Sequence, residues 1–363
     1  PDALNKLDIS FASAAAAATS SPNVAAGAEF AFSTRYQTAN WAGEVYAQKI
    51  DPLTGEVADF KEWRAHELLL SKIGPNADTR NLWMFDPATA TKLKPFSFPS
   101  MTPAEQAFFG NKCFPLSTMT QCTTLTPFQL IDANDGDKLV RFLRGQTELE
   151  TTVFRDRQEI REEDNTLIQT VLGDIINAQP LFVPGTPFFE YSDPGYTTFK
   201  TVTLKNRRGT LYIAANDGYL HAFDGSTGVE NWAYMPRFVM PGVYQIADSG
   251  YAGKHRFFLD GTPEFQDVFD VYSGTWKTIL VGGANGGARG YYAVDITDPQ
   301  NPKGLWEACS DPTLCAISDP DLGFTYGAFI EAPEGRPEVR GYYLHVWKRL
   351  ADGWALAADV KNQ

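Results

Sequence analysis

A short motif recurs three times along the chain and constrains the fold more than any other feature of the sequence. Each copy begins with Gly, continues through an alternating strand-like stretch to an Asp, passes a tight turn and ends at a Trp. The copies occupy residues 43–63, 218–232 and 290–306, and the third is the loosest of them. The entering Gly permits the backbone of the turn, and the alternation is typical of a half-buried strand.

A hairpin of this kind cannot bury both of its faces alone, so such units stack radially as blades, with the Trp packed between neighbouring sheets. The copies are unevenly spaced, which indicates that blades are missing, degenerate or interrupted by insertions. We therefore predict an all-β fold, an irregular β-propeller over residues 28–363 that is incomplete in this chain. Helical insertions are expected at about residues 64–178, and the final blades are expected to be missing or divergent.

Three segments have the pattern of helices. In residues 1–20, Leu4, Leu7 and Phe11 share one helical face ahead of an Ala run, so we assign residues 1–27 to an N-terminal helix and linker. Thr102 followed by Pro is a typical N-cap and first helical position. Residues 137–144 predict a third helix.

Composition excludes several classes of function. The 363 residues contain 31 Lys and Arg against 44 Asp and Glu, a net charge of −13, which argues against sequence-independent binding to nucleic acid. No stretch reaches 18 consecutive apolar residues, so we expect no membrane span. The chain begins at Pro1 and has no leader pattern, which we interpret as a processed piece of a longer protein.

Four cysteines fall into two close pairs, Cys113 with Cys122 and Cys309 with Cys315, each inside a turn-rich segment. Two local disulfides are the simplest interpretation and predict an oxidising compartment. Four free thiols in a cytosolic protein are the alternative. A zinc site fits less well, because neither pair has the usual ligand spacing and no His flanks either pair.

Residues 132–137 resemble the first half of a calcium loop, and Asp132, Asn134 and Asp137 are the candidate ligands. The register is one residue short and no bidentate Glu follows, so a polar turn in which Asp137 caps the next helix is the alternative. The four histidines are scattered, and His221 lies inside a repeat strand as a packed or hydrogen-bonded core residue. No nucleophile motif appears, and we predict neither an enzyme nor a cofactor other than calcium.

Several stretches resemble the C-terminal propeller domain of the PilC/PilY proteins of bacterial type IV pili, in the same order along the chain. The resemblance spans roughly residues 1–330. The matching stretches are Asn40–Glu44, Leu143–Gly145, Leu172–Pro180, Ala215–Asp224, His255–Gly261, Trp276–Gly290, Ala293–Pro299 and Asp321–Gly327.

This resemblance implies a modified propeller of seven blades within an exported protein of the pilus tip and cell surface. Such proteins prime pilus assembly with minor pilins, oppose retraction, support twitching motility and mediate adhesion to a host or abiotic surface. The family's calcium loop, a D-x-D-x-D run, is not found in the sequence. Gln146 stands where the family usually shows Asp, and residues 333–363 depart from the family pattern.

Two other functions remain open from the sequence. The repeat is similar to that of quinoprotein dehydrogenases, but it recurs too few times for eight blades and no vicinal Cys-Cys exists to cover a quinone. A carbohydrate-binding propeller would present Trp and Tyr on a loop face.

Overall fold

The structure is a computed structural model. It describes residues 11–13, 18–19, 30–74, 77–161, 164–186, 189–192, 195–270, 273–315, 317–318, 322–331, 339–350 and 353–362. The chain divides into two compact units, Pro1–Glu307 and Ala308–Gln363. None of the helices in these described ranges has the length and apolar character of a membrane-spanning helix.

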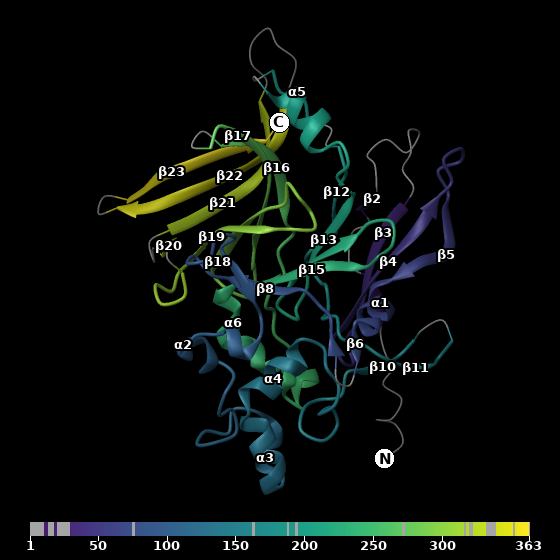
Figure 1. The fold of residues 1–363 in the computed structure, drawn as a ribbon, viewed down its shortest axis with the longest axis vertical. Helices are drawn as coiled ribbons and strands as arrows, with labels where there is room; N and C mark the ends of the chain where they lie inside the picture. The colour runs from purple at the N-terminus through teal and green to yellow at the C-terminus, as the bar shows by residue number, and fades with distance from the viewer. Residues whose placement is uncertain are drawn as a thin grey trace. The chain divides into compact units, whose positions relative to one another are not determined.

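The first sheet contains the first copy of the repeat. Its strands follow the order β1-β3-β4-β5, and β2 also pairs with β3. They are β1 (Phe11–Ser13), β2 (Ala18–Thr19), β3 (Phe30–Gln37), β4 (Ala42–Ile50) and β5 (Val57–Arg64). The strands β3, β4 and β5 lie side by side in Figure 1.

The helix expected over residues 1–20 is wrong where the structure describes this stretch. Phe11–Ser13 and Ala18–Thr19 are strands that pair antiparallel with β3. Helix propensity is a weak preference, and the backbone groups along the edge of β3 offer hydrogen bonds that override it. The remaining residues of the expected helix lie outside the described part, so the division at residue 27 stays a prediction.

The second sheet is built from the second copy of the repeat. Its strand order is β12-β13-β14-β15-β8-β9, in which β8 joins β15 in parallel and the other pairs are antiparallel. The strands are β8 (Leu82–Phe85), β9 (Leu93–Pro95), β12 (Leu181–Val183), β13 (Thr210–Ala214), β14 (Leu220–Asp224) and β15 (Glu230–Met235). The expected insertion therefore contributes two strands to a blade.

The third copy forms the third sheet, with the order β16-β17-β18-β19-β20. The glycine-rich stretch before residue 290 is the connection of an antiparallel hairpin. The second unit contains an antiparallel sheet of three strands. The strands of these two sheets are β16 (Glu264–Asp270), β17 (Thr275–Gly283), β18 (Gly290–Asp295), β19 (Lys303–Cys309), β20 (Ile317–Ser318), β21 (Leu322–Glu331), β22 (Val339–Leu350) and β23 (Gly353–Asn362).

The same turn closes the hairpin in the first two copies. Asp51 Oδ1 accepts hydrogen bonds from two backbone N–H groups of its turn, and Asp224 Oδ1 does the same in the second sheet. Gly55 and Gly228 end these turns with φ of 75° and 69°, a left-handed conformation that glycine adopts without strain.

In the first two copies the repeat Trp packs against the turn of the next sheet, as the sequence predicts. Trp63 Nε1 donates to the Gly225 carbonyl at 3.2 Å, and Trp232 Nε1 donates to the Pro299 carbonyl at 2.8 Å. Both indoles are buried. The first three sheets are thus linked in sequence order by one recurring contact.

Helices gather in the segment between β9 and β10, as expected. The Thr102 side chain caps the predicted second helix in a capping box with Glu105. The third predicted helix is present, but Asp135 caps it and not Asp137 as the alternative had it. The helices and minor strands are α1 (Ala65–Ser71), β6 (Ile73–Gly74), β7 (Ala77–Asp78), η3 (Phe98–Ser100), α2 (Pro103–Gln106), η4 (Thr120–Thr123), α3 (Pro127–Asn134), α4 (Gly136–Leu143), β10 (Gln158–Ile160), β11 (Leu167–Gln169), α5 (Tyr196–Thr198), η5 (Phe199–Thr203), η6 (Arg237–Val239), α6 (Met240–Val243), η7 (Tyr244–Ala247) and η8 (Tyr251–Gly253).

Candidate functional site

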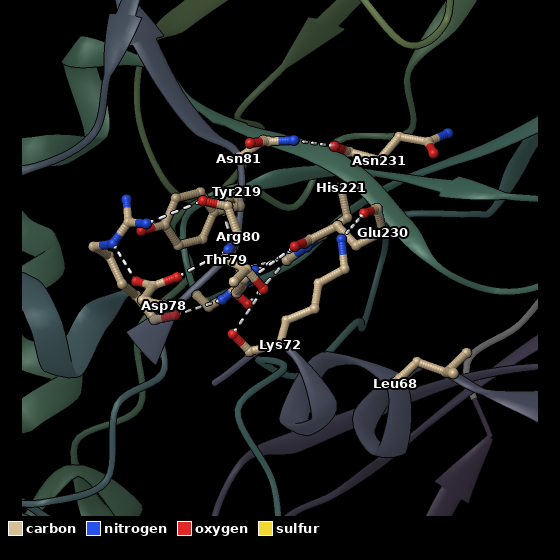
Figure 2. Close-up of polar contacts among 12 residues, drawn as sticks. Leu68, Lys72, Asp78, Thr79, Arg80, Asn81, Tyr219, His221, Glu230 and Asn231 are labelled. Atoms are coloured by element: carbon tan, nitrogen blue, oxygen red, sulfur yellow. Dashed lines mark hydrogen bonds and ion pairs between the residues drawn. The ribbon is translucent and has the colours of Figure 1, made fainter. Parts of the chain in front are cut away.

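A buried ion pair joins the inserted segment to the second sheet. Arg80 follows β7, and Glu230 is the first residue of β15. The guanidinium meets the carboxylate in bidentate fashion, with Nε–Oε2 and Nη2–Oε1 both at 2.8 Å (Figure 2). Both side chains are almost fully buried, so their charges compensate one another away from water.

His221 extends this ion pair into a chain of charges. Its Nδ1 lies 2.8 Å from Glu230 Oε1, and its Nε2 lies 3.1 Å from Asp217 Oδ2. Burial disfavours the imidazolium, but Asp217 and Glu230 outweigh burial and raise the pKa of His221 to about 9. Burial alone would raise the pKa of the Glu230 carboxyl, because it disfavours the charged form there too. Arg80 and His221 outweigh burial and hold this pKa well below its usual value. His221 is therefore a protonated core residue that donates from both ring nitrogens.

Two more cations tie the insertion to this network. Arg144 reaches the Asp78 carboxylate through Nε at 2.5 Å, and its Nη2 donates to the Arg80 carbonyl at 3.1 Å. In return, Arg80 Nη1 donates to the Arg144 carbonyl at 2.8 Å. Lys72 Nζ donates to the Glu230 carbonyl. Three segments distant in sequence, residues 72–80, residue 144 and residues 217–230, are thereby held together.

A second polar cluster lies where the motifs of the first two sheets meet. Asp174 accepts from Asn216 Nδ2 at 2.7 Å and lies 2.9 Å from His255 Nε2. The ring of Trp41 stacks on His255 with centroids 3.8 Å apart. The Gly173 N–H donates to Asp217 Oδ2 at 3.1 Å, which connects this cluster to the His221 network.

Glycine is required at the centre of this cluster because three backbone segments touch there. A Cβ on Gly43 would lie 2.0 Å from the Gly173 carbonyl oxygen. A Cβ on Gly173 would lie 2.3 Å from the Asp217 nitrogen. The backbone segments around Gly43, Gly173 and Asp217 are far apart in the sequence but meet at van der Waals distance in the fold.

An open pocket of about 460 Å³ adjoins the arginines of the insertion. Its charged and polar lining includes Arg80, Arg141, Arg144, Asp78 and Asp137. Each of the three guanidiniums already contacts a carboxylate: Glu230, Glu148 and Asp78, respectively. The three arginines that line the pocket are therefore already paired with carboxylates of the protein. We interpret them as residues that stabilise the fold.

The predicted calcium ligands have other contacts. Asp132 pairs with Lys138, and Asn134 Oδ1 accepts the N–H groups of Cys113 and Phe114. Asp137 lines the pocket. Within the described ranges, no three His, Cys, Asp or Glu side chains form a metal-binding group. Calcium at Asp132, Asn134 and Asp137 stays a prediction.

The two expected disulfides are present. Cys113 is bonded to Cys122 and Cys309 to Cys315. The first bridge lies beside the Asn134 side chain that holds the N–H of Cys113. Both bridges are local, as the spacing of the cysteines predicts.

Sequence reasoning missed Arg80, Asp217 and Glu230. Glu230 lies inside the second repeat copy, opposite Phe223, so its proximity to His221 on the same strand could have been inferred from the hairpin register. Asp217 directly precedes that copy, four residues before His221. Arg80 lies in the insertion, 150 residues from Glu230, and no local pattern indicates its partner.

Comparison with known proteins agrees with the collinear motifs. Residues 172–327 match the family model of the PilY1 beta-propeller domain. The chain is 31% identical over 295 residues to the type IV pilus biogenesis factor PilY1 of Pseudomonas aeruginosa strain UCBPP-PA14, covering 79% of this chain and 22% of that protein. The chain belongs to the PilC/PilY family.

Two further comparisons align over shorter parts of the chain. A PilY1 homolog of Xylella fastidiosa strain Temecula1 is 37% identical over 145 residues, or 39% of this chain and 12% of that protein. The crystal structure of the Pseudomonas aeruginosa PilY1 C-terminal domain aligns with a TM-score of 0.32 at 26% identity, covering 50% of this chain and 37% of that one. The chain thus spans at most about a fifth of the length of these two curated relatives.

Membership of the PilC/PilY family confirms the resemblance seen in the sequence, and the matched domain confirms a propeller-type fold rich in strands. The number of blades and the closure of the ring stay predictions. Within the family match lie Asp174, Asp217, His221, Glu230 and His255. The two buried clusters therefore belong largely to the matched domain.

Proposed function

We propose that the chain is the propeller part of a type IV pilus biogenesis protein and that it acts by binding other proteins without catalysing a reaction. The observation that carries this proposal is the buried network of Arg80, His221 and Glu230 in a domain matched to the PilY1 propeller. Its charges are paired inside the protein, which suits a rigid scaffold in a filament system.

The finer role that we propose is at the pilus tip. There the protein would assemble with minor pilins, oppose retraction, support twitching motility and bind a host or abiotic surface. The names of the relatives as pilus biogenesis factors support the pilus role. The two disulfides support export, since such bonds persist in the periplasm and outside the cell.

A chimeric replacement would test this role. The homologous region of Pseudomonas aeruginosa PilY1 would be exchanged for this chain, and surface pili and twitching would be measured in a strain lacking its own PilY1. We expect pili to return to the sheared surface fraction together with the chimeric protein. A Glu230→Gln chimera should lose this activity in proportion to its loss of folded protein.

Two outcomes of the chimera experiment would overturn the proposal. Export of a folded chimera that never enters the pilus fraction would remove the tip assignment. Retention of the chimera in the cytosol with free thiols would remove the export assignment as well.

A further inference from the structure

The outer strand of the first sheet has an open edge. β5 ends the strand order of that sheet, and no described strand pairs with its outer side (Figure 1). Its first four residues, Val57–Phe60, are all exposed. An edge of this kind presents backbone N–H and C=O groups to which another strand can bond.

The equivalent strands of the next two sheets are covered. Along β15, β8 adds in parallel and Asn81 Nδ2 donates to the Asn231 carbonyl at 3.2 Å. Along β19, the Gly304 N–H donates to the Thr91 carbonyl at 2.8 Å, and Lys92 Nζ donates to the Leu305 carbonyl at 2.9 Å. Residues 72–95 thus cover two outer strands but leave β5 open.

Large apolar side chains accompany this open edge. Phe60 is 71% exposed, and Leu53 in the adjoining turn is 94% exposed. Val57 is also exposed. Such residues beside an unpaired strand edge are typical of a surface that another strand covers.

We propose that β5 pairs antiparallel with β5 of a second copy of this chain, centred on Phe60. We choose a second copy as the partner because the charges along β5 are complementary to themselves in the antiparallel register. In that register Phe60 faces Phe60 of the other copy, and Asp59 faces Lys61 twice, once on each side of the two-fold axis. Opposite charges directly across a strand pair are stabilising, and like charges are destabilising.

Lys61 has a contact within its own sheet, and the pairing of β5 with β4 is irregular beside it. Asp59 and Lys61 lie two residues apart, and the Lys61 ammonium lies over the Tyr46 ring of β4 at 4.5 Å. The pairing of β4 with β5 shifts register on both sides of Gln48, which is opposite Lys61. This inference does not depend on the role in the pilus.

Charge reversal tests the proposal on the full 363-residue chain by sedimentation velocity over a concentration series. We expect the wild type to dimerise, and we expect Asp59→Lys alone and Lys61→Asp alone to weaken dimerisation about tenfold, because each places like charges opposite one another twice. The double variant Asp59→Lys/Lys61→Asp should dimerise again. Mixing the two single variants should form a heterodimer, since each supplies the charges that the other lacks.

Glu190→Lys is the matched control, because it changes the net charge as Asp59→Lys does at an exposed side chain outside β5. It should dimerise like the wild type. A dimer that all the reversals leave intact would place the contact on another surface and overturn the proposal. A wild type that stays monomeric at every concentration would also overturn it, and would mean that the register shifts protect this edge.

Discussion

At the scale of single residues, the protein concentrates its charge compensation at Glu230. This carboxylate contacts Arg80 on one side and His221 on the other, and the backbone carbonyl of Glu230 accepts a hydrogen bond from Lys72. A buried ion pair contributes little net stability by itself, but removing one partner leaves the other charge buried and uncompensated. The network therefore makes the fold sensitive to single substitutions there.

Glu230→Gln should lower the free energy of unfolding by about 3–5 kcal/mol, because Arg80 and His221 would lose their shared anion. The double variant Arg80→Met/Glu230→Leu should lower the free energy of unfolding by less than Arg80→Met alone and Glu230→Leu alone do together. Denaturant titration followed by tryptophan fluorescence measures both. Additive effects would show that the two side chains do not act as a pair.

Stability should fall as pH rises from about 5 to 9, in two steps. Burial raises the pKa of Glu307 to about 7, so the folded state holds a proton that the unfolded chain releases from about pH 4.5 upward. The raised pKa of His221, about 9, extends the loss from about pH 6.5 to 9. Each step is on the order of 3 kcal/mol.

Thermal unfolding between pH 5 and 9 measures these two steps. Glu307→Gln should remove the lower step alone, and His221→Gln should remove the upper step alone. A stability that rises between pH 6.5 and 9 would contradict the assignment of His221 as a cation.

At the scale of elements, the repeated turn determines how neighbouring sheets meet. Gly228 ends the turn of the second hairpin with φ of 69°, and a Cβ there would lie 2.3 Å from the Trp63 ring. Gly55 ends the same turn in the first hairpin, where the adjoining Leu53 is exposed. The two glycines share one backbone requirement but differ in their packing.

Gly228→Ala should therefore destabilise the protein more than Gly55→Ala does. Both variants strain a left-handed residue, at about 1 kcal/mol, and only Gly228→Ala also displaces a buried indole. Comparison of the two denaturation midpoints measures the difference. Equal midpoints would show that Trp63 moves away without cost.

The elements also show where sequence patterns succeed and where they fail. The strands, turns and Trp contacts of the repeats were predictable because their period and turn residues are local. The strand at Phe11–Ser13 was not, because pairing with β3 overrides the helical preference of the segment. The parallel addition of β8 to β15 joins residues about 150 apart, and no local signal indicates it.

At the scale of the whole molecule, the first three sheets are joined in sequence order by the repeat tryptophans. Trp63 links the first sheet to the second, and Trp232 links the second to the third. In stacked repeats each unit is stabilised mainly by its neighbours. A substitution that destabilises one sheet should therefore also destabilise the adjoining sheet.

Trp63→Ala should raise amide hydrogen exchange in the Asp224–Gly228 turn as well as in the first sheet, because the indole covers both. Trp232→Ala should do the same at residues 295–301 of the third sheet, where its indole bonds Pro299. Exchange that rises only around the substituted residue would contradict the coupling of the sheets.

The repeat, the strands built from it, the local disulfides and the family can be read from the amino-acid sequence, because each depends on residue types at short spacing. The meeting of Arg80 with Glu230, the addition of β8 from the insertion to a blade, and the open edge of β5 become visible only in the folded chain. These features join segments many residues apart. Their stability comes from burial and long-range hydrogen bonding, which no short window of sequence contains.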